Sequence, residues 1–175
     1  MLDGKHTAHE PQRRGPHRIL DGEPARTAMQ GRQSARAGPQ DESLRQARTC
    51  YDHLAGRLGV AIANKLADDR AVVMKAGSGW VTEHAADSLG RLGVTDADLL
   101  ETSGAARRVL YRPCMDWSER RIHLAGRLGA AICDGCMDHG WLLRKSTSRA
   151  LEITPRGQVA LRNWMGWDLW RTVLG

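Results

Sequence analysis

The sequence has no long hydrophobic run, and this absence excludes a membrane-spanning segment. No apolar stretch approaches the roughly 20 residues that are needed to cross a bilayer. The first residues are polar and rich in arginine, so they do not form a secretory signal. Cysteine is also scarce, with four residues in 175. In a chain without an export signal, we expect free thiols in a reducing cytoplasm and no disulfides.

Motifs of known enzyme classes are also missing. The sequence contains no phosphate-binding glycine loop, no nucleophile elbow and no His-Glu-x-x-His helix. The segment Asp116–Arg121 does combine an acid, a hydroxyl and bases. On a helix, however, Asp116 with Arg120 and Trp117 with Arg121 would be pairs four residues apart, which suits salt bridging and stacking. We therefore predict a structural use for this segment and no enzymatic activity.

A ten-residue phrase is present twice. Residues 53–62 read HLAGRLGVAI, and residues 123–132 read HLAGRLGAAI, so that only Val60 and Ala130 differ. Similarity at a fixed offset indicates a duplicated supersecondary unit. After each copy, two short apolar runs flank a turn and precede another helical segment, which predicts hairpins within residues 71–81 and 141–153.

The hydrophobic spacing between residues 41 and 66 is that of an amphipathic helix. Gly59 leaves two interpretations open: it marks the turn of a helix-turn-helix, or it allows close approach within one continuous helix. We favour the continuous helix, because small residues recur every four positions on one face in both copies. These are Ala55, Gly59 and Ala63 in the first copy, and Ala125, Gly129 and Cys133 in the second. The pattern predicts that the two repeat helices cross closely.

Together, these patterns predict a mainly α fold with short β-hairpins. It consists of tandem helix–hairpin–helix (winged-helix-like) repeats related by a pseudo-twofold axis, at residues 41–104 and 105–175. Residues 1–40 contain four prolines in a stretch rich in Gly, Arg and Gln, without hydrophobic periodicity. We predict that they form a disordered basic tail.

The net charge of +6 is unevenly distributed. Residues 105–175 carry 12 basic and 6 acidic side chains, whereas residues 41–104 carry 7 and 10. Such asymmetry suits contact with nucleic acid or attraction between the two lobes. The candidate DNA-contacting residues lie at the tip of the second predicted hairpin; they are Arg144, Lys145, Thr147 and Arg149. An ordinary charged turn is the alternative.

Two groups of cysteine and histidine are candidate metal ligands. Cys50 and His53 are three residues apart, and would be neighbours on one face of a helix. Cys133, Cys136 and His139 form the second group. The first repeat has Ala63 and Leu66 at the positions of the two cysteines, which favours core packing for the second group.

Several longer phrases resemble a known family. They are Ala47–Val60, Cys114–Arg121, His123–Gly126, Gly140–Leu142 and Thr154–Gly157. With these phrases, residues 41–175 resemble the C-terminal half of a subgroup of bacterial ArsR-type winged-helix transcriptional regulators. The resemblance implies regulation of transcription by DNA binding as a homodimer. It also implies an effector or metal role for Cys50, His53 and Cys114, with a divalent or thiophilic metal ion as the candidate cofactor.

The sequence differs from the pattern of that subgroup in one respect. In that subgroup, a DNA-reading domain precedes this region, but residues 1–40 contain no helix-turn-helix pattern. We therefore expect a truncated regulator whose N-terminal DNA-reading domain is missing. The alternative is a dimerisation or effector-sensing module with no DNA binding of its own.

Overall fold

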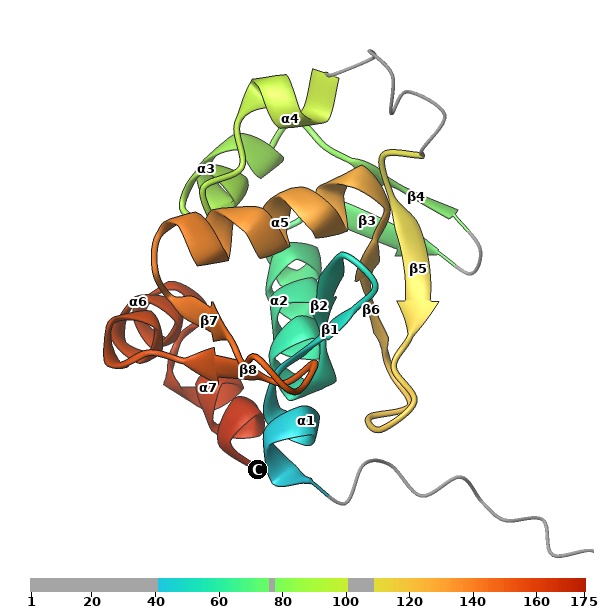
Figure 1. Ribbon diagram of the computed structural model, residues 1–175. Helices are drawn as coiled ribbons and strands as arrows, with labels where there is room; N and C mark the ends of the chain where they lie inside the picture. Colours follow the sequence, from blue (N-terminus) through green and yellow to red (C-terminus); the bar gives the residue numbers. More distant parts are fainter. Residues whose placement is uncertain (1–40, 76–77, 101–108) are drawn as a thin grey trace, which may run out of the picture. The chain divides into compact units, whose positions relative to one another are not determined.

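The computed structural model describes residues 41–75, 78–100 and 109–175 (Figure 1). The predicted tail at residues 1–40 lies outside this part of the chain. The elements in chain order are α1 (Glu42–Gln46), β1 (Arg48–Cys50), β2 (His53–Ala55), α2 (Gly56–Asp68), β3 (Val72–Lys75), β4 (Ser78–Val81), α3 (Ala85–Gly90), α4 (Asp96–Leu100), β5 (Arg112–Met115), β6 (Ile122–Ala125), α5 (Gly126–Asp138), β7 (Leu142–Arg144), β8 (Leu151–Ile153), α6 (Pro155–Met165) and α7 (Trp167–Leu174). None of the helices in these ranges has the length and apolar character needed to span a bilayer.

The predicted continuous helix over residues 41–66 is wrong. Helix α1 ends at Gln46, the chain then forms the antiparallel hairpin β1–β2, and α2 begins only at Gly56. Gly56 has a φ of +78°, and a Cβ atom there would lie 2.6 Å from the carbonyl oxygen of Arg45. Glycine fits this junction because it has no Cβ to clash and adopts positive φ freely. The turn proposed at Gly59 is also wrong, because Gly59 lies inside α2.

The fold is mixed α and β, and the prediction of a mainly α winged-helix-like repeat is wrong. The described ranges contain seven helices and four two-stranded antiparallel sheets. Each copy of the repeated phrase starts in a strand, at His53 or His123, and continues into a helix of 13 residues. Both repeats therefore run hairpin, helix, hairpin, helix.

The later hairpins are present where the sequence predicts them. Strand β3 pairs with β4, and β7 pairs with β8. Helix α6 begins at Pro155, and its N-cap residue Thr154 accepts a hydrogen bond from Gly157 N–H at 3.0 Å. This arrangement satisfies a backbone donor that the helix itself leaves unpaired.

The two repeats interlock through strands and helices. Helix α2 packs against β6 of the second repeat, and α5 packs against β2 of the first. A Cβ atom on Gly59 would lie 3.7 Å from the Cβ of His123, and one on Gly129 would lie 3.0 Å from the Cβ of His53. The small-residue faces thus approach the strands of the other repeat, which corrects the prediction that they meet helix to helix.

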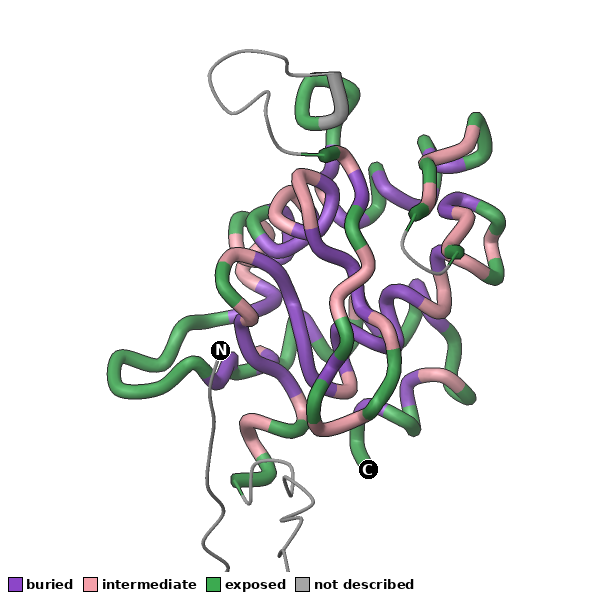
Figure 2. Tube along the Cα trace, turned by 90° about the vertical axis from the view of Figure 1, so that its right-hand side faces the viewer, coloured by how far each residue is buried: buried purple, intermediate pink, exposed green. Residues whose placement is uncertain are grey.

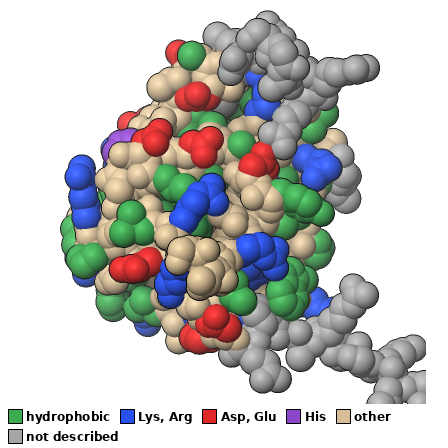
Figure 3. Space-filling view, viewed as in Figure 1, with side chains coloured by type: hydrophobic (Ala, Val, Ile, Leu, Met, Phe, Trp, Pro, Cys, Tyr) green, Lys and Arg blue, Asp and Glu red, His purple; other side chains and the backbone are tan. Residues whose placement is uncertain are grey.

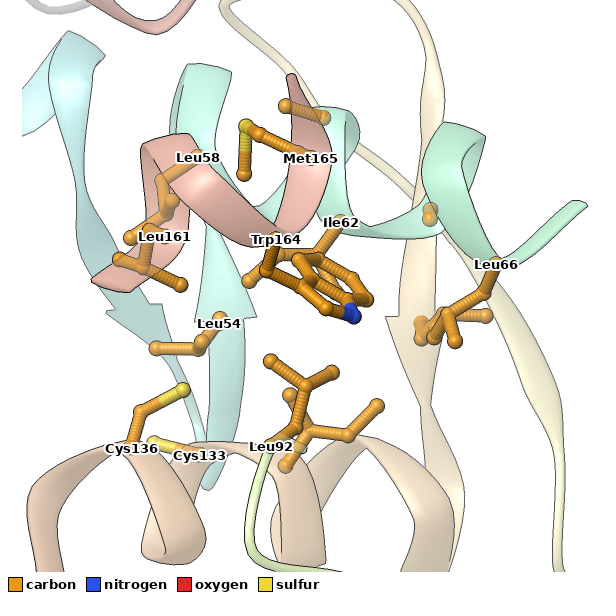
Figure 4. Close-up of a cluster of buried hydrophobic side chains, with 14 of the residues drawn as sticks. Leu54, Leu58, Ile62, Leu66, Leu92, Cys133, Cys136, Leu161, Trp164 and Met165 are labelled. Carbon is orange, nitrogen blue, oxygen red and sulfur yellow. The ribbon is translucent and has the colours of Figure 1, made fainter. Parts of the chain in front are cut away.

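One hydrophobic core contains residues from both repeats. Figure 2 shows that the buried stretches of the trace gather in the interior while exposed stretches lie around it. In the close-up of Figure 4, Leu54 of β2 lies between residues of α6 and the cysteines of α5. This shared core fixes the two N-terminal hairpins of the repeats against each other.

Candidate metal centre

Each of the two hairpins β1–β2 and β5–β6 places a cysteine opposite a histidine. Cys50 is paired in register with His53, and Cys114 is paired with His123. Residues directly opposite each other on antiparallel strands project to the same side of the sheet. Each hairpin therefore presents one sulfur and one imidazole side by side.

Strands β2 and β6 contact each other, and this contact brings the two Cys–His pairs together. Nε2 of His53 lies 3.1 Å from Nε2 of His123. One ligand atom from each of Cys50, His53, Cys114 and His123 lies within 4.8 Å of the others. We call these four residues the Cys–His cluster. It is the only group of three or more such side chains compact enough for a metal among the residues described in Figure 1.

The dimensions of the Cys–His cluster suit a tetrahedral metal ion. Zinc bonds of about 2.1 Å to nitrogen and 2.3 Å to sulfur place neighbouring ligand atoms about 3.3 to 3.8 Å apart. Both histidines are 1% exposed, and both cysteines are partly buried. The cluster can therefore supply four ligands with small side-chain adjustments, which leaves no coordination position for a substrate.

A carboxylate faces the outer nitrogen of each histidine. Nδ1 of His53 lies 3.2 Å from Oδ1 of Asp52, and Nδ1 of His123 lies 3.6 Å from Oδ2 of Asp116. Such carboxylates orient a metal-binding imidazole and make its other nitrogen a better ligand. Each aspartate comes two residues after the cysteine of its own hairpin, so both repeats share the pattern Cys-x-Asp before the histidine.

The carboxylate of Asp116 is held by both repeats. Both of its oxygens accept hydrogen bonds from Nη2 of Arg48 at 2.8 Å, and Oδ2 also accepts one from Gly56 N–H at 2.7 Å. Burial would raise the pKa of Asp116, but the hydrogen bonds from Gly56, Arg48 and Ser118 outweigh burial and hold it well below its usual value. Asp116 is therefore an anion at neutral pH.

Residues 116–121 form a turn between β5 and β6, so the predicted helical pairs of Asp116 with Arg120 and Trp117 with Arg121 are wrong. The observed partner of the Asp116 carboxylate is Arg48, whose guanidinium also lies 5.1 Å from the ring centroid of Trp117. A salt bridge and a cation–π contact are therefore both present, as expected for this segment, but they join the two repeats instead of lying within one helix.

Burial favours the neutral forms of His123 and Cys114 in the absence of metal. Burial, together with the charge of neighbouring His53, lowers the pKa of His123 to about 4. Burial and the adjacent Cys50 raise the pKa of the Cys114 thiol to about 11. His123 is thus ready to bind a cation at pH 7, whereas Cys114 has to release its proton when a metal binds.

The second candidate group is not assembled as a metal site. Cys133 and Cys136 are fully buried, and Figure 4 shows their sulfur atoms among hydrophobic side chains. His139 lies at the end of α5, where its Nδ1 is 2.7 Å from the carbonyl oxygen of Gly135. Burial raises the pKa of both thiols, to about 11 for Cys133 and about 12 for Cys136.

The predicted DNA-contacting residues lie on the exposed end of hairpin β7–β8. All residues from 143 to 149 are exposed, including Arg144, Lys145, Thr147 and Arg149. We call residues 144–149 the basic tip. On the face drawn in Figure 3, Lys and Arg side chains are separated by acidic, polar and hydrophobic ones.

The sequence interpretation missed His123, Asp52 and Asp116 as parts of the centre. Asp52 directly precedes His53, whereas six residues separate Asp116 from His123. At the offset of 70 that aligns the repeated phrases, Cys50 therefore falls opposite Arg120 and not opposite Cys114. Searching for Cys-x-Asp before each copy of the phrase would have found both halves of the centre.

Comparison with known proteins finds one informative similarity. The chain is 35% identical over 127 residues to a Bacillus subtilis (strain 168) protein described as the uncharacterized HTH-type transcriptional regulator YdfF. The match includes 73% of this chain and 54% of that protein, so the chain spans about half the length of its relative. No protein-family profile and no solved structure matches the chain. The relative is described as a regulator and not as an enzyme, in agreement with the prediction of no enzymatic activity.

Proposed function

We propose that residues 41–175 form the metal-binding regulatory part of a transcriptional regulator of the ArsR type. The observation that carries the proposal is the convergence of Cys50, His53, Cys114 and His123 within 4.8 Å, two ligands from each repeat. The similarity to a relative described as a transcriptional regulator supports the regulatory role. The metal ion is the effector in this proposal.

Zinc suits the donor set best. Two thiolates and two imidazoles in a compact tetrahedral arrangement are typical of zinc, and four protein ligands characterise structural or regulatory sites that are closed to substrates. Asp52 and Asp116 would orient the two imidazoles. When bound, the ion would supply a positive charge that favours both thiolates and joins the two hairpins.

Spectroscopy with cobalt tests the metal site directly. Co²⁺ added to the full chain should produce absorption bands of tetrahedral thiolate coordination, and Zn²⁺ should remove them by displacement. Cys50→Ala and His123→Gln should each weaken metal binding by at least about tenfold, since each removes one of four ligands. Cys133→Ala is the matched control, because it removes a buried thiol where the first repeat has Ala63.

The control variant should bind Co²⁺ as the unaltered chain does. Absence of thiolate bands in the unaltered protein, or their persistence in Cys50→Ala, would show that the Cys–His cluster is not the metal site.

DNA contact through the basic tip is the second part of the proposal, with a homodimer as the binding species. Exposed Arg and Lys at a hairpin end can contact phosphates, and such contacts supply affinity more than sequence specificity. The full chain should retain random duplex DNA in a gel at about 50 mM salt and release it as salt rises. Replacing Arg144, Lys145 and Arg149 by Gln should reduce this retention.

A module without DNA binding is the alternative function. On the face drawn in Figure 3, acidic and hydrophobic side chains separate the cationic ones. This face therefore lacks the continuous basic surface that is the usual signature of duplex binding, which favours the alternative. No retention of DNA at about 50 mM salt, with or without Zn²⁺, would select this alternative.

A further inference from the structure

We propose that strand β1 transmits metal occupancy of the Cys–His cluster to hairpin β7–β8, with Arg48 as a positioning residue, so that metal binding fixes the basic tip. The inference rests on the proposed metal site. It concerns how that site regulates another surface of the molecule.

One end of β1 belongs to the metal centre. Cys50 is the last residue of the strand, and its sulfur is one of the four candidate ligand atoms. The strand has three residues, and its antiparallel partner β2 also has three. A hairpin of two such short strands depends on tertiary contacts for its stability, so a metal bond at Cys50 would add a further constraint to this strand.

Arg48 ties the other end of β1 to the same centre. Its side chain is 1% exposed, and its guanidinium donates to both oxygens of Asp116. Asp116 in turn faces Nδ1 of His123 at 3.6 Å. Metal binding at Nε2 of His123 makes the ring a stronger donor at Nδ1, which strengthens its contact with Asp116. Because Asp116 also accepts both hydrogen bonds from Arg48, β1 is joined to the imidazole of His123 as well as to the sulfur of Cys50.

The outer edge of β1 is bonded to the hairpin β7–β8. Thr49 N–H donates to the carbonyl oxygen of Arg149, and Leu151 N–H donates to that of Ala47, both at 2.9 Å. Arg48 and Ala150 form an isolated antiparallel bridge between these bonds. Figure 1 shows the hairpin β7–β8 beside β1. A single short strand thus has the metal centre on one side and the basic tip on the other.

The base and the tip of this hairpin differ in what holds them. Leu142 and Ile153, which pair with each other across the hairpin, are buried in the core, so the base is fixed whether or not metal is present. Residues 143–149 are exposed, and the backbone bonds to β1 are made at the tip's return into β8. Ordering β1 therefore restricts the tip, while the hydrophobic base remains unchanged.

Amide hydrogen exchange on the full chain tests this coupling without requiring DNA. Zn²⁺ should slow exchange of the Thr49 and Leu151 amides by at least about tenfold relative to the metal-free protein, because these amides form the bonds that join residues 47–49 to the hairpin β7–β8. The amide of Thr82 bonds to the carbonyl oxygen of Ala71 in the hairpin β3–β4, and serves as the internal control. Its exchange should slow much less.

Equal slowing at all three amides would indicate general stabilisation and would overturn the coupling, although the metal site would stand. Failure of Co²⁺ to bind in the spectroscopic test would instead refute the proposed function itself. The two failures are therefore distinguishable.

A variant separates coupling from metal binding. Thr49→Pro removes the N–H that bonds to Arg149 but keeps all four ligands, and its cobalt spectrum reports whether the Cys–His cluster is still assembled. It should keep the cobalt spectrum and lose the zinc-dependent protection of Leu151. Thr49→Val retains the N–H and should keep both. Undiminished protection of Leu151 in Thr49→Pro, or lost protection in Thr49→Val, would overturn the proposal.

Discussion

The carboxylate of Asp116 is completely buried and accepts hydrogen bonds from Arg48 and Gly56 of the first repeat and from Ser118 of its own turn. Arg48 is equally buried, so this ion pair is shielded from water. Such a pair need not be more stabilising than hydrophobic residues, but removing one partner leaves an uncompensated charge. We therefore expect the pair to make the contact between the repeats specific, rather than to add much to the overall stability.

The variant Asp116→Asn should lower the free energy of unfolding by about 3 to 5 kcal/mol, because it leaves the Arg48 guanidinium buried without its counter-charge. Urea unfolding in the presence of a chelator measures the loss without a metal contribution. Asp87→Asn is the control, since Asp87 is 81% exposed in its pair with Arg91. It should change stability by less than about 0.5 kcal/mol. A loss at Asp116 as small as this would show that the pair does not hold the repeats together.

His123 makes the metal-free protein sensitive to mild acid. Its pKa is lowered from 6.5 to about 4, so the unfolded chain takes up a proton at a pH where the folded protein does not. The stabilisation is therefore present above pH 6.5 and is lost as the pH falls toward 4. Between pH 7 and pH 5 the loss should be about 2 kcal/mol. Urea unfolding at both pH values, with His123→Gln for comparison, measures it; an equal loss in the variant would assign it to other groups.

At the scale of residues, the sequence supports three of the four members of the Cys–His cluster. Cys50 and His53 are close in sequence, and Cys114 lies in a phrase that resembles the regulator family. The sequence identifies His123 only as the start of the repeated phrase. Its role depends on the contact between β2 and β6, which brings residues 70 positions apart within 3.1 Å. No local pattern contains that information.

Among the elements, the hairpins β1–β2 and β5–β6 are the ones that hydrophobic periodicity did not reveal. All three residues of β2 are buried, so the strand has no alternation of apolar and polar side chains. Leu54 also continues the three- and four-residue spacing of Leu58 and Ile62 in α2, which made strand and helix look continuous. By contrast, the start of helix α6 has a local signal in the sequence, a threonine followed by a proline. In the structure, Thr154 is the N-cap residue and the helix begins at Pro155.

Glycine at position 129 is required by the contact between α5 and the strand that precedes it. A Cβ atom there would lie 2.3 Å from the carbonyl oxygen of Leu124 and 3.0 Å from the Cβ of His53. Gly129→Ala should therefore destabilise the protein by about 1 to 3 kcal/mol, because backbone atoms have to move. Thermal unfolding compares it with Gly90→Ala in α3, where a Cβ would meet no atom within 4 Å.

Gly90→Ala should change the stability of the protein in the opposite direction. Alanine at position 90 fits the helix without strain, and should stabilise the protein by about 0.5 to 1 kcal/mol. Equal effects at both positions would contradict the close approach described for Gly129.

At the scale of the whole molecule, the two repeats share one core and one candidate metal site. Zinc at about 100 times its dissociation constant should stabilise the folded state by about 2.7 kcal/mol, since the unfolded chain does not hold the four ligands together. Calorimetry should show a rise in Tm of roughly 5 to 10 °C for a protein of this size. Because Cys114 releases a proton on binding, the rise should be larger at pH 8 than at pH 6.

Chelation should reverse the rise in Tm, and Cys114→Ala should reduce it by at least about half at the same zinc concentration. A rise of the same size in that variant would place the stabilising ion elsewhere in the protein.

The Cys-x-Asp and histidine pattern occurs once in each repeat, so one repeat holds half of the candidate ligand set. A single copy could complete that shell only by meeting a second molecule, and its metal affinity would fall with dilution. Duplication within one chain makes the second half an intramolecular ligand, whose effective concentration is in the millimolar range and is independent of how much protein is present. A site of this kind would report the concentration of metal without reporting the concentration of the protein.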